Sequence, residues 1–399
     1  MNNFEFYSPT RFVFGRDTED QTGSLVREMG GTRVLLCYGG QHAEKSGLLD
    51  RVVRSLNREG LLVFQHGGIL PNPTDENVYK GLRIGQENSV DFVVAVGGGS
   101  VIDAAKAIAA GLLYDGDFWD FYAGRLPIEK ALPVGVVLTI PAAGSEGSGN
   151  SVITQVKSHK KVSLRTPFAL RPKFAVMNPV LTFTLPPYQT AAGAVDMMAH
   201  IMERYFTPTP HTEVTDALSE SLLRTIMEVL PRVLAEPSDY DARAALMWCG
   251  TLAHNGICGT GNEEDWASHG LEHELSAFYG VTHGAGLAVI FPAWLSVAAE
   301  LRPEKPAQWA RNVMGVQPID NPVADTREGL RRYRRFLQSV GMPRTIDELG
   351  IEDFDLDLVS QHVHETKGEV FGAYLKIDRT LSRRVYEEAL KPLDDSVEA

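Results

Sequence analysis

Residues 91–110 read DFVVAVGGGSVIDAAKAIAA, and this stretch decides the fold class. Residues 93–96 form a short valine-rich run that is typical of a buried strand, and an alanine-rich segment that favours helix follows it. The three glycines between them predict a tight turn without side chains, with Ser100 as the helix cap. Such a turn suits a pyrophosphate, although it is neither a Walker loop nor G-x-G-x-x-G. From the triple glycine alone, a phosphate-binding turn and a purely structural turn both stay open.

Short β-branched runs alternate with helical stretches on both sides of this segment. We expect strands at 34–38, 61–64, 92–96, 136–140 and 174–177, and the start MNNFEFYSPTRFVFG also alternates like a strand. This alternation predicts a mostly parallel sheet flanked by helices. After Leu185 the pattern becomes helical, as in VTDALSESLLRTIMEVLPRVL. We therefore predict an α/β dinucleotide-binding domain over residues 1–185 and an all-helical, metal-binding catalytic domain over residues 186–399.

Composition excludes several classes of protein. A chain of 399 residues with 44% hydrophobic content can bury large cores, and its net charge of −13 argues against nucleic acid or an anionic membrane as a partner. The 3 cysteines are scattered without a C-x-x-C pair, which fits a reducing cytoplasm. We see neither a signal-peptide pattern nor a run of about 18 apolar residues, so we expect no membrane span.

Histidines and one aspartate in the second half have the spacing of a metal site. Asp196 and His200 are four residues apart in AAGAVDMMAHIMERY, so a helix would place them on one face. His269 and His273 share the same spacing, and His283 follows a Tyr-Gly break where a new helix begins. A lone histidine is usually an ordinary core or surface residue, but three imidazoles with a carboxylate suit a first-row divalent ion. The spacing predicts one site built from two helices and a loop. The run HELSA lacks the second histidine of a zinc protease, which disfavours proteolysis.

These motifs together resemble the iron-containing (group III) alcohol dehydrogenases, and within them the butanol dehydrogenase-like branch. The resemblance spans nearly the whole chain and rests on PNPT at 71–74, GGGSVIDAAK at 97–106, TIPAAGSE at 139–146 and the spaced Asp and His residues. It implies a dinucleotide-binding α/β domain, a helical C-terminal domain, a cleft between them and a catalytic divalent metal, iron or zinc. It also implies a homodimer, often formed through the first strands.

The resemblance can be carried over residue by residue. Asp196, His200, His269 and His283 match the metal ligands. His273 matches a histidine near the nicotinamide, which is either a proton relay or a structural neighbour of the ligands. The positions that match cofactor contacts are Gly97, Gly98, Gly99, Ser100, Asp103, Asn72, Thr139, Ser145 and Lys161. Lys160 adjoins the last of these, so the choice between the two lysines stays open.

The preference between NAD and NADP depends on the end of the first strand. Relatives that prefer NAD commonly carry an aspartate near Gly39, where it binds the ribose 2′-hydroxyl and repels a 2′-phosphate. Gly39 and Gly40 leave room here, which favours NADP, with His42 and Lys45 as phosphate partners. Glu44 argues the other way, because an inward carboxylate would repel the phosphate.

The resemblance implies a metal-dependent NAD(P)-linked alcohol dehydrogenase or aldehyde reductase. We expect small-molecule substrates, namely primary alcohols and aliphatic or simple aromatic aldehydes. A dehydroquinate synthase-like lyase or a glycerol-type polyol dehydrogenase on the same fold stays an alternative. Four aromatic residues could line an apolar substrate pocket, although such residues are more often core: Trp119, Phe121, Trp266 and Phe278.

Overall fold

The computed structural model describes residues 1–40 and 45–391, and the chain divides into two compact units. One unit is Tyr7–Leu185 with Gly250–Gly256, and the other is Met1–Phe6, Pro186–Cys249 and Ile257–Ala399. Two short segments thus belong to a different unit from the one that the sequence pattern predicts. Long-range contacts are the reason: Asn2 N donates to Gly261 O at 2.9 Å, and Thr251 Oγ1 donates to Glu146 Oε1 at 2.6 Å.

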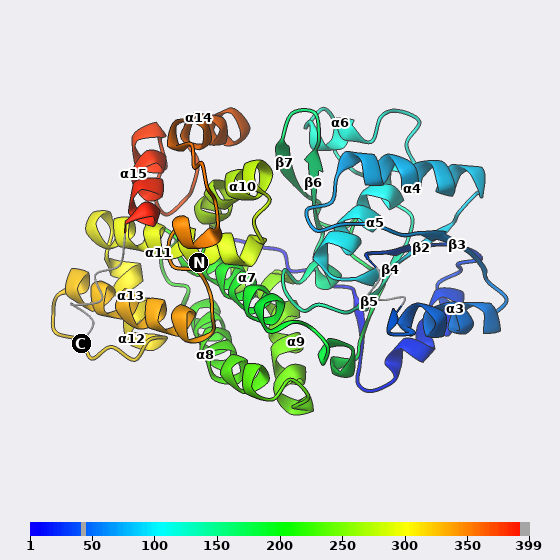
Figure 1. Ribbon diagram of the computed structural model, residues 1–399, viewed down its shortest axis with the longest axis horizontal. Helices are drawn as coiled ribbons and strands as arrows, with labels where there is room; N and C mark the ends of the chain where they lie inside the picture. The colour runs from blue at the N-terminus through cyan, green and yellow to red at the C-terminus, as the bar shows by residue number, and fades with distance from the viewer. Residues whose placement is uncertain (41–44, 392–399) are drawn as a thin grey trace. The chain divides into compact units, whose positions relative to one another are not determined.

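The first unit contains a six-stranded sheet in which every neighbouring pair is parallel, in the order β1-β8-β5-β4-β2-β3 (Figure 1). The strands are β1 Arg11–Phe14, β2 Arg33–Tyr38, β3 Leu62–His66, β4 Phe92–Gly97, β5 Val134–Leu138 and β8 Phe174–Met177. The predicted α/β class is confirmed. The expected strands occur. Of the alternating segment at the N-terminus, however, only Arg11–Phe14 forms a strand, β1, and β5 begins two residues before the predicted run at 136–140.

Helices cover both faces of this sheet. They are α1 Thr22–Glu28, α3 Leu48–Arg58, α4 Asp75–Glu87, α5 Gly99–Gly111 and the short α6 Trp119–Tyr122. Figure 1 shows α4 and α5 on one face and α3 on the other. Beneath α1 and α3 lies a core of fully buried aliphatic side chains, with Val34, Leu36 and Val94 from the sheet and Val52 and Leu56 from α3. This burial fixes the sheet, and with it the loops at its carboxyl edge.

An antiparallel hairpin of β6 Asn150–Gln155 and β7 Lys160–Arg165 also belongs to this unit. The sequence did not predict it. Its second strand reads KKVSLR, in which charged residues replace the apolar run that marks a buried strand. Ser100 is a further correction, because Gly98 is the N-cap of α5 and Ser100 lies inside the helix.

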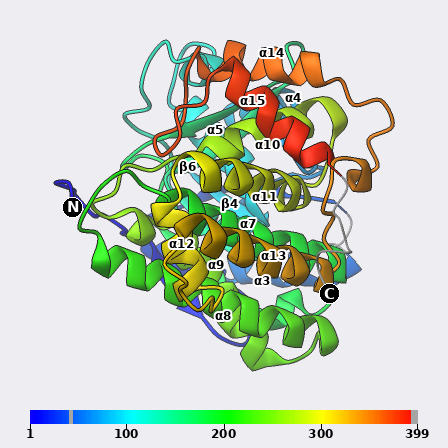
Figure 2. The same cartoon turned by 90° about the vertical axis from the view of Figure 1, so that its left-hand side faces the viewer.

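The second unit is helical, as predicted. Its helices are α7 Pro187–Tyr205, α8 Glu213–Ala235, α9 Tyr240–His254, α10 Ala267–Tyr279, α11 His283–Leu301, α12 Glu304–Asn312, α13 Pro322–Ser339, α14 Leu356–Lys367 and α15 Arg379–Leu390, except that the end of α9 from Gly250 belongs to the first unit. Figure 2 shows α11 in the middle of this bundle, and it contacts α7, α10, α13 and α15.

Helix α11 is apolar on nearly every side. Among residues 1–40 and 45–391 it is the one helix long and apolar enough to cross a membrane, with a mean hydropathy of 1.6. However, 83% of that window is buried inside the protein. An all-round apolar helix in the centre of a bundle is a core helix.

Candidate metal centre and dinucleotide-binding loops

Three helices of the second unit supply the predicted metal ligands. Helix α7 carries Asp196 and His200 one turn apart, which places both side chains on one face. Helix α10 carries His269 and ends at Tyr279, and the next residue, Gly280, has a left-handed φ of 65° that breaks the helix. His283 is then the first residue of α11. The predicted arrangement of two helices and a loop is therefore corrected to three helices.

One carboxylate oxygen, Asp196 Oδ1, lies among three imidazole nitrogens. It is 3.3 Å from His200 Nε2, 3.8 Å from His269 Nε2 and 3.8 Å from His283 Nε2. The side chains of Asp196, His200 and His269 are almost completely buried, whereas that of His283 is 24% exposed. The structure thus brings all four predicted ligands together, with one histidine that solvent can reach.

Two buried atoms test whether this cluster fits a metal ion. Asp196 Oδ1 and His269 Nε2 make no hydrogen bond within the described part of the chain. Buried polar atoms are nearly always paired, so two orphans that face the same point indicate a missing partner. A divalent cation would be a partner to both, and one carboxylate with three imidazoles is a donor set that iron and zinc accept. The residues present therefore fit the metal.

The charge states of Asp196 and His200 also suit a cation. Burial raises the pKa of Asp196, but the neighbouring imidazoles outweigh burial and hold it well below its ordinary value. Burial lowers the pKa of His200 to about 3, against the opposing effect of Asp196. A charged carboxylate beside a neutral imidazole is the ionisation state in which both can bind a metal.

Two buried glutamates lie behind the histidines, and the sequence prediction missed both. Glu203 Oε1 is 2.9 Å from His269 Nδ1, and Glu272 Oε2 contacts His283 Nδ1. Their signal in the sequence is a glutamate three residues after a histidine, in HIME at 200–203 and HGLE at 269–272. Each glutamate thus lies on the ligand-bearing face of its helix.

His273 lies beside the ligands. It is buried, and its ring centroid is 6.4 Å from that of His269 and 5.6 Å from that of His283. Its ligand atoms also group with those of Glu272 and His283, all within 4.8 Å of one another. The structure therefore places His273 at the edge of the cluster, next to the ligand with the greatest exposure.

The glycine turn predicted at residues 97–99 links β4 to α5 in the first unit. A Cβ at Gly97 would come within 2.6 Å of Val101, and one at Gly98 within 3.0 Å of Ile140. A side chain at either position would crowd its neighbour, and the first backbone N–H groups of α5 have no acceptor within the helix. The geometry matches a turn that accepts phosphate at a helix N-terminus.

Asp103 and Ser145 hold the neighbouring loop. Ser145 Oγ donates to Asp103 Oδ1 at 2.6 Å, and Val152 N donates to Asp103 Oδ2 at 3.0 Å. Burial raises the pKa of Asp103, against the opposing effect of Lys106. Both carboxylate oxygens therefore accept hydrogen bonds inside the unit, and this pair fixes the loop in which the resemblance places cofactor contacts.

Lys106 is a third residue to which the sequence interpretation assigned no role. Its fully buried ammonium donates to Ser145 O, Ser145 Oγ, Ser148 O and Asn150 O, at 2.7, 2.9, 2.9 and 2.8 Å. Burial lowers its pKa to about 8, although Asp103 and Glu146 oppose that shift. The Lys106 ammonium on α5 thus binds three backbone carbonyls of the neighbouring loop, those of Ser145, Ser148 and Asn150.

The remaining predicted cofactor residues lie in loops or on the hairpin. Asn72 has a left-handed backbone, with φ of 53°, between two prolines, and Thr139 N donates to Gly97 O at 3.0 Å. Lys161 is 6% exposed and lies close enough to Asp103 to lower its pKa. Lys161 therefore lies near Asp103 of α5, while Lys160 is the more exposed of the two, and the choice between them as a cofactor contact stays a prediction.

Gly39 and Gly40 follow β2 at the same edge of the sheet. A Cβ at Gly39 would lie 3.3 Å from Ile69 O, and one at Gly40 would meet nothing within 4 Å. Neither backbone has the positive φ that would exclude a side chain. His42 and Glu44 lie outside the described residues, and Lys45 is exposed.

Comparison with known proteins finds a matching family for the α/β part of the chain and for the helical part. Residues 9–179 match the family described as iron-containing alcohol dehydrogenase, and residues 190–389 match the Fe-containing alcohol dehydrogenase family, C-terminal. The chain belongs to the iron-containing alcohol dehydrogenase family.

Individual relatives cover almost the full chain. The probable NADH-dependent butanol dehydrogenase 1 of Bacillus subtilis (strain 168) is 39% identical over 363 residues, which are 90% of this chain and 93% of that protein. The NADPH-dependent aldehyde reductase YqhD of Escherichia coli (strain K12) is 36% identical over 398 residues, which are 98% of this chain and 100% of that protein. A crystal structure of NADH-dependent butanol dehydrogenase A from Thermotoga maritima has a TM-score of 0.94 at 38% identity and covers 98% of this chain and 99% of that one. The predicted resemblance to the butanol dehydrogenase-like branch is confirmed.

Of the four predicted pocket aromatics in this iron-containing alcohol dehydrogenase, Trp266 borders the candidate metal cluster. Its ring centroid is 5.5 Å from that of His200 and 5.1 Å from that of His269. Its φ of 62° is a left-handed conformation that a bulky residue rarely adopts, and such strain is concentrated at functional sites. Trp119 and Phe121 are instead core residues of the first unit.

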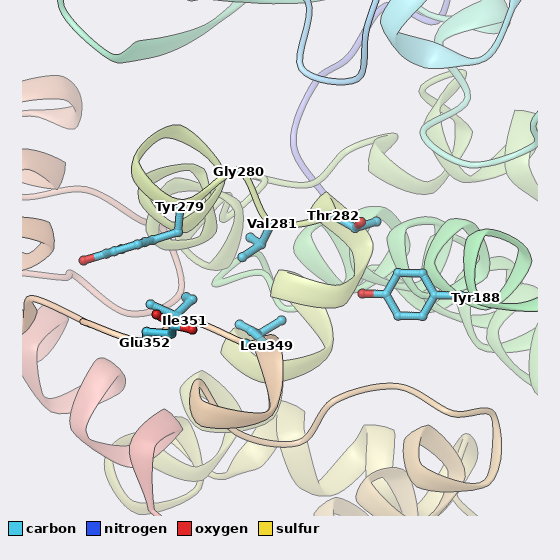
Figure 3. A pocket seen from close by; sticks show the side chains of 9 residues that line it. Tyr188, Tyr279, Gly280, Val281, Thr282, Leu349, Ile351 and Glu352 are labelled. Carbon is cyan, nitrogen blue, oxygen red and sulfur yellow. The ribbon is translucent and has the colours of Figure 1, made fainter. Parts of the chain in front are cut away.

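A pocket of about 500 Å³ in the second unit has a different lining. Figure 3 shows Tyr188 pointing into it, with the loop of Val281 and Thr282 on one side and Leu349 and Ile351 on another. Tyr188 and Tyr279 are the aromatic residues in its lining, so none of the four predicted aromatics lines it. Thr282 directly precedes the candidate ligand His283.

Proposed function

We propose that this protein is a metal-dependent NAD(P)-linked alcohol dehydrogenase that also reduces aldehydes. The observation that carries the proposal is the buried cluster in which three imidazole nitrogens lie 3.3 to 3.8 Å from one oxygen of Asp196. The family to which the chain belongs supports the same chemistry. The reaction transfers a hydride between the substrate carbon and the nicotinamide, and it acts on primary alcohols and on aliphatic or simple aromatic aldehydes.

In this proposal Asp196, His200, His269 and His283 bind iron or zinc. A divalent ion supplies Lewis acidity, which lowers the pKa of an alcohol or polarises the carbonyl of an aldehyde. The protein excludes water from most of the cluster, because three of the four side chains are buried, and exclusion strengthens every electrostatic interaction there. His283, the most exposed ligand, marks the side from which substrate approaches.

His273 relays a proton between the substrate oxygen and solvent. Its buried position beside His283, the most exposed of the four proposed ligands, supports this role. His273→Ala should keep the metal and slow turnover by roughly 10²- to 10⁴-fold with an altered pH profile. Loss of the metal from this variant would instead make His273 a ligand.

The α/β unit binds the dinucleotide through the turn at residues 97–99 and the loop that Asp103 and Lys106 hold. We propose a preference for NADP, because no carboxylate at Gly39 or Gly40 would repel the 2′-phosphate. Named relatives include NADH- and NADPH-dependent enzymes, so the preference depends on this local argument alone. The proposed assembly is a cytoplasmic homodimer, with the helical unit as the catalytic domain.

Reduction of butanal tests the proposal. Enzyme stripped with a chelator is reconstituted with Fe²⁺, with Zn²⁺ or with no metal, and the oxidation of NADPH and of NADH is followed. We expect turnover only with metal, and faster with NADPH. Equal turnover without metal would contradict the metal-dependent mechanism, and no turnover on folded, metal-loaded enzyme would favour the lyase alternative.

A further inference from the structure

The helices of the metal cluster repeat one pattern, in which a histidine is followed three residues later by a buried glutamate. Helix α7 has His200 and Glu203, and α10 has His269 and Glu272. The two glutamate side chains are 1% and 0% exposed, which is rare for glutamate unless the carboxylate is paired. Spacing of three residues turns each glutamate towards the same neighbouring helix as the preceding histidine.

Each glutamate contacts the ligand on the next helix rather than the one on its own. Glu203 of α7 accepts a hydrogen bond from the backbone N of His269 at 2.8 Å and lies 2.9 Å from its Nδ1. Glu272 of α10 contacts Nδ1 of His283 at the start of α11. The contacts thus run in series from α7 to α10 and from α10 to α11.

The surroundings of Glu272 are shaped to hold it. Ser276 Oγ donates to its second oxygen at 2.5 Å, so the serine and the histidine occupy different carboxylate oxygens. A Cβ at Gly286 would come within 2.6 Å of that second oxygen. The glycine therefore leaves the space that the carboxylate fills, and a serine and a glycine on two helices fix its orientation.

These contacts determine which imidazole nitrogen carries the proton. An ionised carboxylate can only accept, so Nδ1 of His269 and of His283 must be the donor in each pair. When such a ring binds a metal it is neutral, and with the proton on Nδ1 its lone pair is on Nε2. In both residues Nε2 is the nitrogen that lies 3.8 Å from Asp196 Oδ1. The glutamates thus aim two lone pairs at the point where the metal is proposed.

We propose that Glu203 and Glu272 are positioning residues that fix the tautomer and ring orientation of His269 and His283 and raise the affinity of the site for a divalent cation. This inference rests on the metal site of the proposed function. Neither glutamate is one of the four proposed ligands, and each acts through the histidine that it holds. Partners of this kind typically change metal affinity by about 10- to 100-fold.

Glu274 supplies a matched control on the same helix. It is 2% exposed, and its Oε2 lies 2.5 Å from Nδ1 of His362 on α14. It is therefore a buried glutamate paired with a histidine, as Glu272 is, but its histidine is not one of the four candidate ligands. Loss of its charge should disturb packing to a similar degree without changing the metal cluster.

The test measures Zn²⁺ affinity by competition with a chromophoric chelator in the full-length protein. Glu203→Gln and Glu272→Gln keep the size of the side chain and remove its charge, and we expect each to weaken Zn²⁺ binding by about 10- to 100-fold. Glu274→Gln should bind Zn²⁺ as the wild type does. The absorption spectrum of the Co²⁺-loaded protein should change in the first two variants and not in the third, and thermal unfolding of the metal-free proteins verifies that all are folded.

The outcomes separate this inference from the proposed function. Wild-type Zn²⁺ affinity and an unchanged Co²⁺ spectrum in both Glu203→Gln and Glu272→Gln would overturn the positioning role while leaving the metal site intact. An equal loss of affinity in Glu274→Gln would also overturn it, because the effect would then be one of general packing. Failure of the wild-type protein to bind Zn²⁺ or Co²⁺ would refute the metal site and the inference together.

Discussion

Gly284 is the position at which a single methyl group should disturb the metal cluster most directly. It follows His283 on α11, and a Cβ there would lie 1.9 Å from the carbonyl oxygen of Ala192 on α7. In an α-helix that carbonyl accepts the N–H of the residue four places later, which is Asp196. Gly284→Ala must therefore push apart the two turns that carry Asp196 and His283.

The magnitude follows from the distance. Contacts of a Cβ below 3.0 Å essentially never occur, so the helices must separate by about 1 Å at a point where backbone meets backbone. Overpacking of this kind costs about 1–3 kcal/mol, or more when the neighbour cannot move. At about 2–4 °C per kcal/mol for a unit of this size, the melting temperature should fall by several degrees. Metal affinity should fall too, because two ligands move apart.

Gly270→Ala is the matched control. Gly270 follows His269 on α10 as Gly284 follows His283 on α11, but a Cβ there would meet its nearest neighbour at an ordinary 3.4 Å. Alanine in a helix interior is favoured over glycine by roughly 0.5–1 kcal/mol, so this variant should be slightly more stable than the wild type. Calorimetry and metal analysis measure both variants. A Gly284→Ala protein with wild-type melting temperature and metal content would refute the argument from close packing.

Three other perturbations test the cofactor loops and a buried acid. Gly39→Asp should raise the ratio of kcat/KM with NADH to kcat/KM with NADPH, whereas the uncharged Gly39→Asn should change this ratio less. An unchanged ratio in Gly39→Asp would mean that other residues distinguish the ribose 2′-hydroxyl from the 2′-phosphate. Lys106→Met should destabilise the protein by about 3–5 kcal/mol in denaturant unfolding, because buried carboxylates and carbonyls lose the cation that they bind. The control Lys157→Met changes an exposed lysine and should have little effect. Equal stability of the two variants would contradict the role of the Lys106 hydrogen bonds. Burial, followed by the charge of Glu203, raises the pKa of Asp265 to about 8. Because the folded protein then binds more protons than the unfolded chain between about pH 4 and pH 8, this group makes stability fall as the pH rises through that window. Asp265→Asn should flatten that dependence in unfolding measurements, and an unaltered slope would contradict the raised pKa.

Local patterns predicted much of the fold because they report on local structure. The valine run before Gly97 is buried on both faces of a parallel sheet, and such strands read as continuous apolar runs. The hairpin strand at 160–165 is half exposed and charged, so it lacks that signal. The extended segment at 1–6 joins the helical unit through contacts with residues more than 200 positions away, as in the bond from Met1 N to Pro210 O. No window of sequence contains information on such a contact.

In the candidate site, too, local spacing was predictable from the sequence and long-range contacts were not. The spacing of Asp196, His200, His269 and His283 indicated the four candidate ligands, since i, i+4 pairs lie on one face of a helix. Glu203 and Glu272 had a comparable spacing signal, but their role depends on contacts across helices, which spacing alone does not define. Trp266 could be placed near the ligands by its sequence position, whereas its left-handed backbone could not be predicted, because that conformation is disfavoured for every bulky residue.

The most direct test of the account is the metal content of the purified protein and of Asp196→Ala, each dialysed against Zn²⁺ and then against buffer. We predict about one equivalent of zinc per chain in the wild type and none in the variant, with the variant still folded by circular dichroism. A folded Asp196→Ala protein that retains a full equivalent would contradict the claim that Asp196, His200, His269 and His283 form the metal site.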